Sequence, residues 1–162
     1  MAIGDVTGVG RNDVLLVTSF YFDPANDYML FVFPQRPDGT LDAPVKYPAA
    51  GTYTSAPDTV ATGDVDGDGR NDVVVGNSGD AIGVFYQNPS GTLDPVSLHP
   101  TADSKCVRIA DLNHDGRLDI VGAGWGTDTV TVPGELAPAA RAGTARVPVR
   151  SLAPLLLVLV ER

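Results

Sequence analysis

The hydrophobic residues of this chain occur in short, β-branched runs that are separated by glycine, asparagine and proline. The clearest series of such runs lies at residues 59–62, 73–75, 82–86 and 96–98. Short apolar runs bounded by turn residues are typical of β-strands, and no window of the sequence has the periodicity of an amphipathic helix. The pattern therefore predicts an all-β protein in which this part of the chain supplies four strands.

Similar runs precede and follow this series. They lie at residues 14–17, 29–33 and 45–47, and again at 106–110, 120–122 and 129–132. Cys106, the one cysteine, falls in such a run and is expected to be a small buried hydrophobe. Repeated units of about 50 residues, each with four strands, are typical of propeller blades. The run that should precede Asp5 is nearly missing.

A polar segment of nine residues recurs between the first two runs of each unit. We name the three copies loop 1 (residues 5–13), loop 2 (residues 64–72) and loop 3 (residues 111–119). Loop 2 has aspartate at positions 1, 3, 5 and 9 and glycine at position 6. Loop 3 keeps this pattern with asparagine at position 3, whereas loop 1 has threonine and valine at positions 3 and 5.

A second marker confirms that the chain is repetitive. Gly39-Thr40-Leu41-Asp42 recurs as Gly91-Thr92-Leu93-Asp94, 52 residues further on. Two markers in register indicate a repeat protein rather than a chance motif.

These segments resemble FG-GAP/VCBS repeats, whose blades are known from the integrin α-subunit propeller. The resemblance rests on residues 63–77 and 110–121. It implies an all-β, β-propeller-like array of four-stranded antiparallel blades, of which about three are present. The repeats would span residues 1–132, with blades near 1–57, 58–104 and 105–132 onward. Residues 133–162 are expected to be a degenerate remainder of the third blade or a poorly ordered tail.

Because a propeller usually closes with four to eight blades, the chain is predicted to be a piece of a longer array. Its open blade edges would allow self-association.

The loops have the composition of a calcium site. Calcium prefers six to eight oxygen ligands, and short aspartates at alternate positions of a tight loop converge on one point. In loop 2 the predicted ligands are the side chains of Asp64, Asp66, Asp68 and Asp72 and the backbone carbonyl of Arg70.

Loop 3 offers a similar set with one negative charge fewer, so we expect it to bind calcium more weakly. Its predicted ligands are Asp111, Asn113, Asp115 and Asp119 and the carbonyl of Arg117. Loop 1 offers only Asp5, Thr7 and Asp13 as weak ligands, because Val9 has no side-chain oxygen. Loop 1 is therefore expected to be a structural turn.

Other interpretations of the loops are less consistent with the sequence. An EF-hand needs glutamate at position 12 and flanking helices, but position 12 is Val75 or Gly122. Magnesium is less suited to a cage made only of protein carboxylates. An acidic turn that hydrogen-bonds to itself, without a metal, remains the alternative.

Composition narrows the function further. The chain has 18 Asp but only 2 Glu, and a net charge of −9, which argues against a general nucleic-acid binder. The apolar run at residues 155–160 is much shorter than the roughly 20 residues of a membrane helix. Two histidines, His99 and His114, make no convincing catalytic constellation or zinc site, so we expect a non-enzyme.

The leading hypothesis is therefore a non-catalytic, calcium-binding module for adhesion or partner binding. Extracellular calcium modules bind at about 10⁻⁴–10⁻³ M, so we expect a secreted or cell-surface protein, although this chain carries no signal peptide. The alternative is a carbohydrate-binding propeller, or an accessory domain of an extracellular polysaccharide-acting enzyme, with Trp125 and Tyr86 as candidate sugar-stacking residues. A third hypothesis is a purely structural array.

Overall fold

The computed structural model describes residues 1–18, 28–49, 56–77, 81–101, 104–124, 129–133 and 144–148. Within these ranges every regular element is a strand, and the strands form three four-stranded antiparallel sheets. The predicted all-β, propeller-like fold is confirmed. None of the described segments is a helix with the length and hydropathy of a membrane span.

The first sheet contains β1 (Ala2–Gly4), β2 (Asp13–Val17), β3 (Met29–Phe33) and β4 (Val45–Pro48). The second contains β5 (Pro57–Gly63), β6 (Asp72–Asn77), β7 (Ala81–Phe85) and β8 (Ser97–Pro100). The third contains β9 (Cys106–Ala110), β10 (Asp119–Ala123), β11 (Thr129–Pro133) and β12 (Thr144–Pro148).

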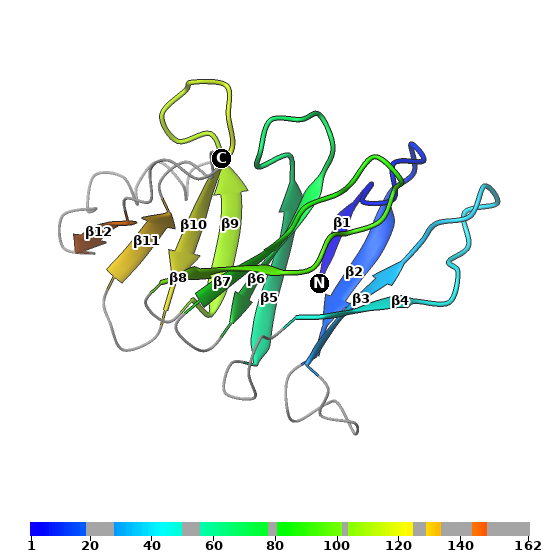
Figure 1. Cartoon of the computed structure of the whole chain (residues 1–162), viewed down its shortest axis with the longest axis horizontal. Coiled ribbons are helices and arrows are strands. Elements are labelled where there is room, and N and C mark those ends of the chain that lie inside the picture. Colours follow the sequence, from blue (N-terminus) through cyan, green and yellow to red (C-terminus); the bar gives the residue numbers. More distant parts are fainter. Residues whose placement is uncertain are drawn as a thin grey trace.

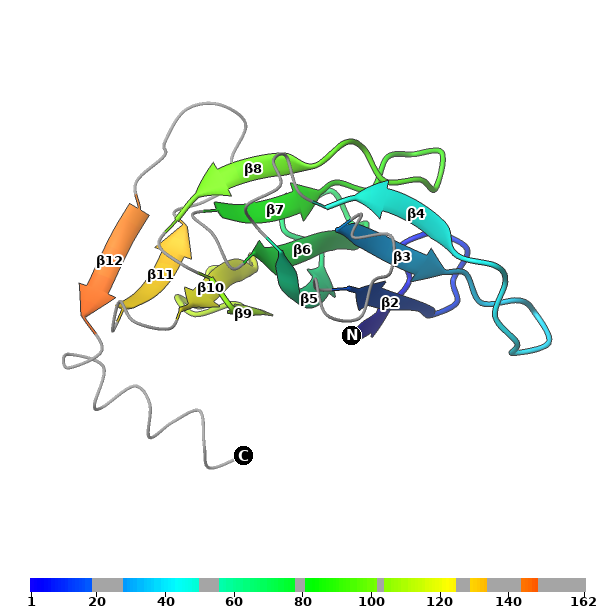
Figure 2. The ribbon, with the colours of Figure 1, turned by 90° about the horizontal axis from the view of Figure 1, so that it is seen from below.

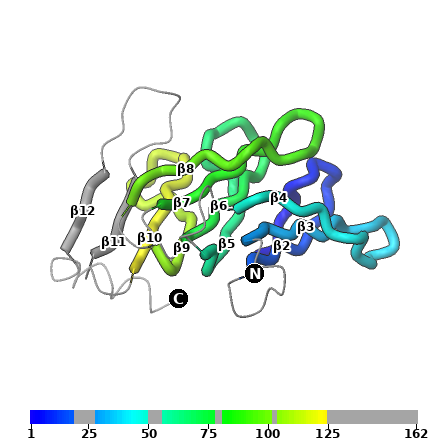
Figure 3. The backbone as a smooth tube through the Cα atoms, turned by 60° about the horizontal axis from the view of Figure 1, so that its bottom comes forward, coloured from blue at the N-terminus to red at the C-terminus, as the bar shows by residue number. Residues whose placement is uncertain are grey.

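Each sheet is a meander in which every strand pairs with the next one along the chain. The sheets lie side by side in chain order (Figure 1), and the tube in Figure 3 follows the chain from the first sheet to the third. The early strands β5 and β9 lie at one edge of the array, and the late strands β4 and β8 at the opposite edge (Figure 2). Each of loops 1, 2 and 3 connects the first and second strands of its sheet, and the three loops project from the same side of the array (Figure 1).

The second repeat marker forms the same turn in the first two sheets. Gly39 and Gly91 both adopt positive φ angles, 84° and 76°, a conformation that glycine adopts without steric cost. The isolated bridge Gln35–Leu41 in one turn is matched by Gln87–Leu93 in the other. The interval of 52 residues in the sequence therefore corresponds to a repeat of backbone structure.

Two hydrophobic clusters hold neighbouring sheets together. The first cluster includes Leu15 and Leu30 of the first sheet and Val73, Val75 and Phe85 of the second. The second cluster joins the opposite face of the second sheet to the third, and includes Val74, Val84, Val107 and Ile120. The middle sheet is thus buried on both faces, and all six residues of β6 are buried.

Three details differ from, or add to, the sequence-based predictions. A short first strand, β1, forms before Asp5 and pairs with β2. Cys106 is exposed, so the prediction that it is buried was wrong. The alternation of β9 turns Val107 into the second cluster and leaves Cys106 on the other face. Within the predicted remainder or tail, residues 144–148 pair with β11 as β12.

Candidate metal centre

The three loops share one backbone conformation. The residues at positions 4 and 6 all have positive φ angles: Gly8, Gly10, Gly67, Gly69, His114 and Gly116. Glycine adopts such angles without the penalty that a Cβ atom causes, which explains why it recurs at position 6. His114 is the one side chain in this set that takes a left-handed conformation (φ 62°).

The aspartate at position 1 folds each loop around its own carboxylate. In loop 2, Asp64 Oδ1 accepts hydrogen bonds from the backbone N–H groups of Gly67 (2.7 Å) and Asp68 (3.1 Å). Its Oδ2 accepts a third bond from Gly69 (2.8 Å). In loop 1, Asp5 accepts the equivalent bonds from Gly8, Val9 and Gly10. This network forms whether or not positions 3 and 5 carry carboxylates.

The aspartate at position 9 ties the loop to the following turn. Asp72 is fully buried, and its carboxylate accepts bonds from the N–H groups of Val65 (3.0 Å) and Gln87 (2.9 Å). Asp13, also fully buried, does the same with Val6 and Gln35, each at 3.0 Å. Position 9 thus has a structural role in both sheets.

The arginine at position 7 completes this attachment. Arg70 Nε donates to the carbonyl oxygen of Gln87 at 2.9 Å, and Arg11 Nε donates to that of Gln35 at 2.9 Å. Both polar groups of the Gln87 backbone are therefore bound by loop 2. The guanidinium of Arg70 also forms an ion pair with Asp68.

Loop 2 brings three carboxylates together. Ligand atoms of Asp64, Asp66 and Asp72 all lie within 4.8 Å of one another. Asp68 stands outside this group, because its carboxylate pairs with Arg70. A carboxylate offers about four lone-pair sites, and the bonds described above leave some of these sites available on all three residues. The donor set is thus suited to a hard, oxygen-seeking cation.

The electrostatics of loop 2 also favour a cation. Burial raises the pKa of Asp72 to about 6, against the lowering effect of hydrogen bonds from Gln87 and Val65, while the charges of Asp66 and Asp68 add to the rise. Burial is also the main cause that raises the pKa of Asp66, with contributions from Asp68 and Asp64. A bound cation would relieve this unfavourable negative charge.

The other two loops hold their predicted ligands differently. In loop 3, Asn113 Nδ2 donates to Asp115 Oδ2 at 2.9 Å, so two predicted ligands bond to each other. Asp119 accepts a bond from the N–H of Leu112 at 3.0 Å. In loop 1, the hydroxyl of Thr7 donates to Asp13 Oδ2 at 3.0 Å, and Val9 is exposed.

The sequence matches the FG-GAP-like repeat family over residues 5–75 and 64–122. The chain belongs to this family. Both matches begin at the first aspartate of a loop, so in the first two sheets the FG-GAP-like repeat unit starts one strand after the start of the sheet. No curated protein matches the sequence.

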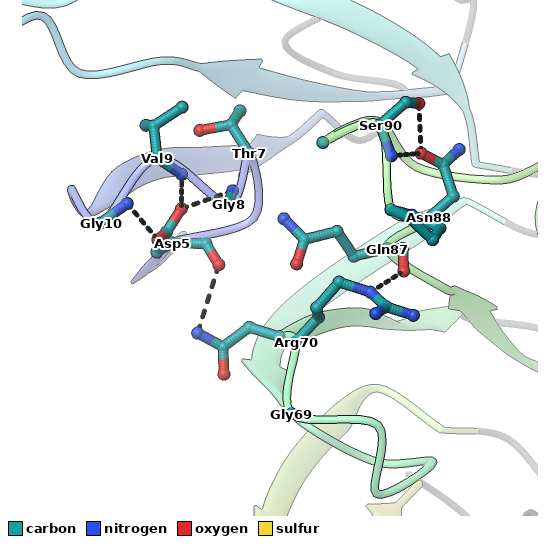
Figure 4. A pocket seen from close by; sticks show the side chains of 13 residues that line it. Asp5, Thr7, Gly8, Val9, Gly10, Gly69, Arg70, Gln87, Asn88 and Ser90 are labelled. Carbon is teal, nitrogen blue, oxygen red and sulfur yellow. Dashed lines mark hydrogen bonds between the residues drawn. The ribbon is translucent and has the colours of Figure 1, made fainter.

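A cleft that the sequence did not reveal lies between the first two FG-GAP-like repeats. The cleft has a volume of about 610 Å³ and is lined by loop 1, the end of loop 2 and the β7–β8 turn (Figure 4). Gln87 lines it and is 2% exposed. One feature of the sequence indicated that Gln87 occupies a repeated position: Gln35 and Gln87 are 52 residues apart, the same interval as Gly39 and Gly91.

The structure gives no support to the hypothesis that Tyr86 and Trp125 stack on a sugar together. Tyr86 packs against the second cluster, whereas Trp125 lies outside the described residues.

Proposed function

We propose that this chain is a calcium-stabilised, non-catalytic module of an extracellular protein, and that it serves adhesion or partner binding. One observation carries the proposal: ligand atoms of Asp64, Asp66 and Asp72 lie within 4.8 Å of one another, in a loop whose shape is held by backbone hydrogen bonds to Asp64 and Asp72. Calcium would be held by these residues and by Asp68, and would neutralise their mutual repulsion.

The three loops should differ in calcium affinity. Loop 2 offers four carboxylates and should bind most tightly. Loop 3, with Asn113 at position 3, should bind more weakly, with Asp111, Asp115, Asp119 and the Arg117 carbonyl as its other ligands. Loop 1 should not bind appreciably, because Val9 has no oxygen and the hydroxyl of Thr7 is engaged with Asp13.

The proposed location follows from the expected affinity. Sites that bind calcium at about 10⁻⁴–10⁻³ M would be filled outside a cell and nearly empty in the cytosol. Membership of the FG-GAP-like repeat family supports an extracellular binding role, because repeats of this family are typically extracellular.

Calcium titration tests the proposal. By isothermal calorimetry at pH 7.5, the protein should bind calcium, and Asp66→Asn should weaken the tightest site to about the affinity of loop 3, which has asparagine at this position. At 10 mM calcium the folded state should gain about 1.4–2.7 kcal/mol from a site in this affinity range. Asp58→Asn is the matched control, because it removes an equal charge from an exposed position on β5.

Calcium binding by Asp58→Asn should equal that of the unmodified protein. The proposal fails if calcium neither binds nor raises the melting temperature of folded protein. It also fails if Asp58→Asn reduces binding as much as Asp66→Asn, because the effect would then be one of net charge.

A further inference from the structure

The cleft between the first two sheets has rigid walls. Asn71 Nδ2 in loop 2 donates to the carbonyl oxygen of Asp5 in loop 1 at 3.2 Å. On the other side, Gly91 approaches loop 1 so closely that a Cβ atom there would lie 2.3 Å from the carbonyl oxygen of Thr7. Contacts at two places fix the separation of the walls, so the cleft of about 610 Å³ is preformed.

A buried hydrogen-bond donor in the cleft lacks an acceptor. Gln87 is 2% exposed, and its Nε2 atom has no partner among the described residues. The side chain extends from the second sheet toward loop 1 (Figure 4), where Nε2 would lie 3.5 Å from a Cβ atom on Gly8. A buried N–H group without a partner is costly, so an acceptor on a ligand would complete the site.

A guanidinium lies next to this donor, and an ion pair with Asp68 neutralises its charge. Arg70 lines the cleft, and its Nε is fixed by the carbonyl oxygen of Gln87 at 2.9 Å. Its Nη2 pairs with Asp68, the position-5 carboxylate expected to bind calcium. A calcium ion in loop 2 would compete for Asp68 and leave the terminal nitrogens of Arg70 available.

The chemistry of these groups identifies the ligand. An arginine fork combined with an amide donor suits the planar, two-oxygen acceptor of a carboxylate. None of the described residues that line the cleft is aromatic, so these residues offer no surface on which the face of a sugar ring could stack. Glycines from both walls, Gly8, Gly10, Gly69 and Gly91, leave room for a peptide segment to approach.

We propose that this cleft binds the carboxylate of an acidic side chain on a partner protein, and that calcium in loop 2 enables this binding by drawing Asp68 away from Arg70. The second part rests on the proposed calcium function. The net charge of −9 opposes an anionic ligand, and the bound calcium ion partly offsets that repulsion. The carboxylate of Asp5 is occupied by three backbone N–H groups of its own loop.

The experiment uses N-acetyl-aspartate N′-methylamide as the probe, with the neutral asparagine analogue as its control. The full chain is titrated by NMR, following the side-chain signals of Gln87 and Arg70, in 10 mM calcium and after removal of calcium. The aspartate probe should bind at least tenfold more tightly with calcium than without it, and the asparagine analogue should not bind.

Two variants test the named groups. Gln87→Leu keeps the buried volume but removes the donor, and should weaken probe binding at least tenfold in calcium. Gln35→Leu, at the equivalent position of the first sheet and outside the cleft, should leave it unchanged. Asp68→Asn should allow the probe to bind without calcium, because Arg70 then has no carboxylate partner in loop 2.

Calorimetric calcium titration of the same samples separates the two proposals. If calcium does not bind, the proposed function fails, while Asp68→Asn still tests the cleft without any metal. If calcium binds to loop 2 but the aspartate probe does not, the cleft proposal is overturned. Equal binding of both probes, binding of galacturonate instead of the aspartate probe, or an unchanged affinity in Gln87→Leu would also overturn it.

Discussion

Loops 1 and 2 have the same backbone but different chemistry. In both, the first aspartate accepts three backbone N–H bonds, and the ninth binds the next turn through Gln35 or Gln87. They differ at positions 3 and 5, where loop 1 has Thr7 and Val9 and loop 2 has Asp66 and Asp68. Thr7 donates a hydrogen bond to Asp13, whereas an ionised Asp66 can only repel Asp72.

The comparison separates two roles within one motif. Positions 1 and 9 shape the loop in the absence of metal, since loop 1 keeps the shape with only those carboxylates. Positions 3 and 5 add negative charge that the fold does not need, which is the charge that a cation would use. Substitutions at the two kinds of position should therefore have different consequences.

The largest effect is expected at position 9 in both loops. Asp72→Ala and Asp13→Ala each remove the acceptor of two backbone N–H groups in a fully buried site. Each should lower the free energy of unfolding by about 2–4 kcal/mol in calcium-free urea denaturation. Asp58→Ala should change it by less than about 0.5 kcal/mol. A loss in Asp72→Ala alone would mean that the scaffold roles of the two loops differ.

A gain-of-function variant tests the other half of the comparison. Thr7→Asp combined with Val9→Asp gives loop 1 the carboxylate pattern of loop 2. The variant should be less stable than the unmodified protein without calcium, because Asp13 loses a donor and gains a charged neighbour. It should bind one additional calcium ion by calorimetry, with a stabilisation of about 1.4–2.7 kcal/mol at 10 mM calcium. If the number of bound ions does not rise, the shared backbone is insufficient for a metal site.

The smallest effect concerns pH. The pKa of Asp72 is raised to about 6 in the folded protein, from 3.8, so between these values the folded state binds a proton that the unfolded state does not. This group therefore makes the calcium-free protein more stable as pH falls from about 7 to about 4. Protons also compete with calcium for the site.

The difference in melting temperature between calcium-bound and calcium-stripped protein should consequently narrow between pH 7.5 and pH 5.0. Thermal melting in matched buffers measures it, with calcium removed by desalting rather than by a chelator. A difference that stays constant over this range would exclude Asp72 from the metal site.

Much of the fold could be predicted because each strand carries its own local signal. The β-branched run at Val73–Val75 predicts a strand, and the glycine at the β7–β8 turn predicts a turn. Both signals lie within a few residues of the element that they predict. Cys106 was misassigned because an apolar run does not reveal which side of a strand faces the core. The three residues of β1 are too few to form a recognisable pattern, although they pair with β2.

The acidic cluster of Asp64, Asp66 and Asp72 was predictable for the same reason, since these residues lie within one contiguous loop. The pairing of Asp68 with Arg70 was not, because a pattern of aspartates does not show which carboxylates point at one another. The cleft at Gln87 was also out of reach. It exists only where loop 1 meets a turn more than 70 residues later in the chain, and that adjacency is a property of sheet packing.

The position of β6 between both hydrophobic clusters has a kinetic consequence. Val73 and Val75 face the first cluster and Val74 faces the second. The residue of β2 that corresponds to Val75 is Leu16. It is 38% exposed on the open face of the first sheet. Amide hydrogens in β2 can exchange with solvent through partial opening of one outer sheet. Those of β6 exchange only when the middle sheet has lost both neighbours, so the slowest-exchanging amides report the global unfolding of the array.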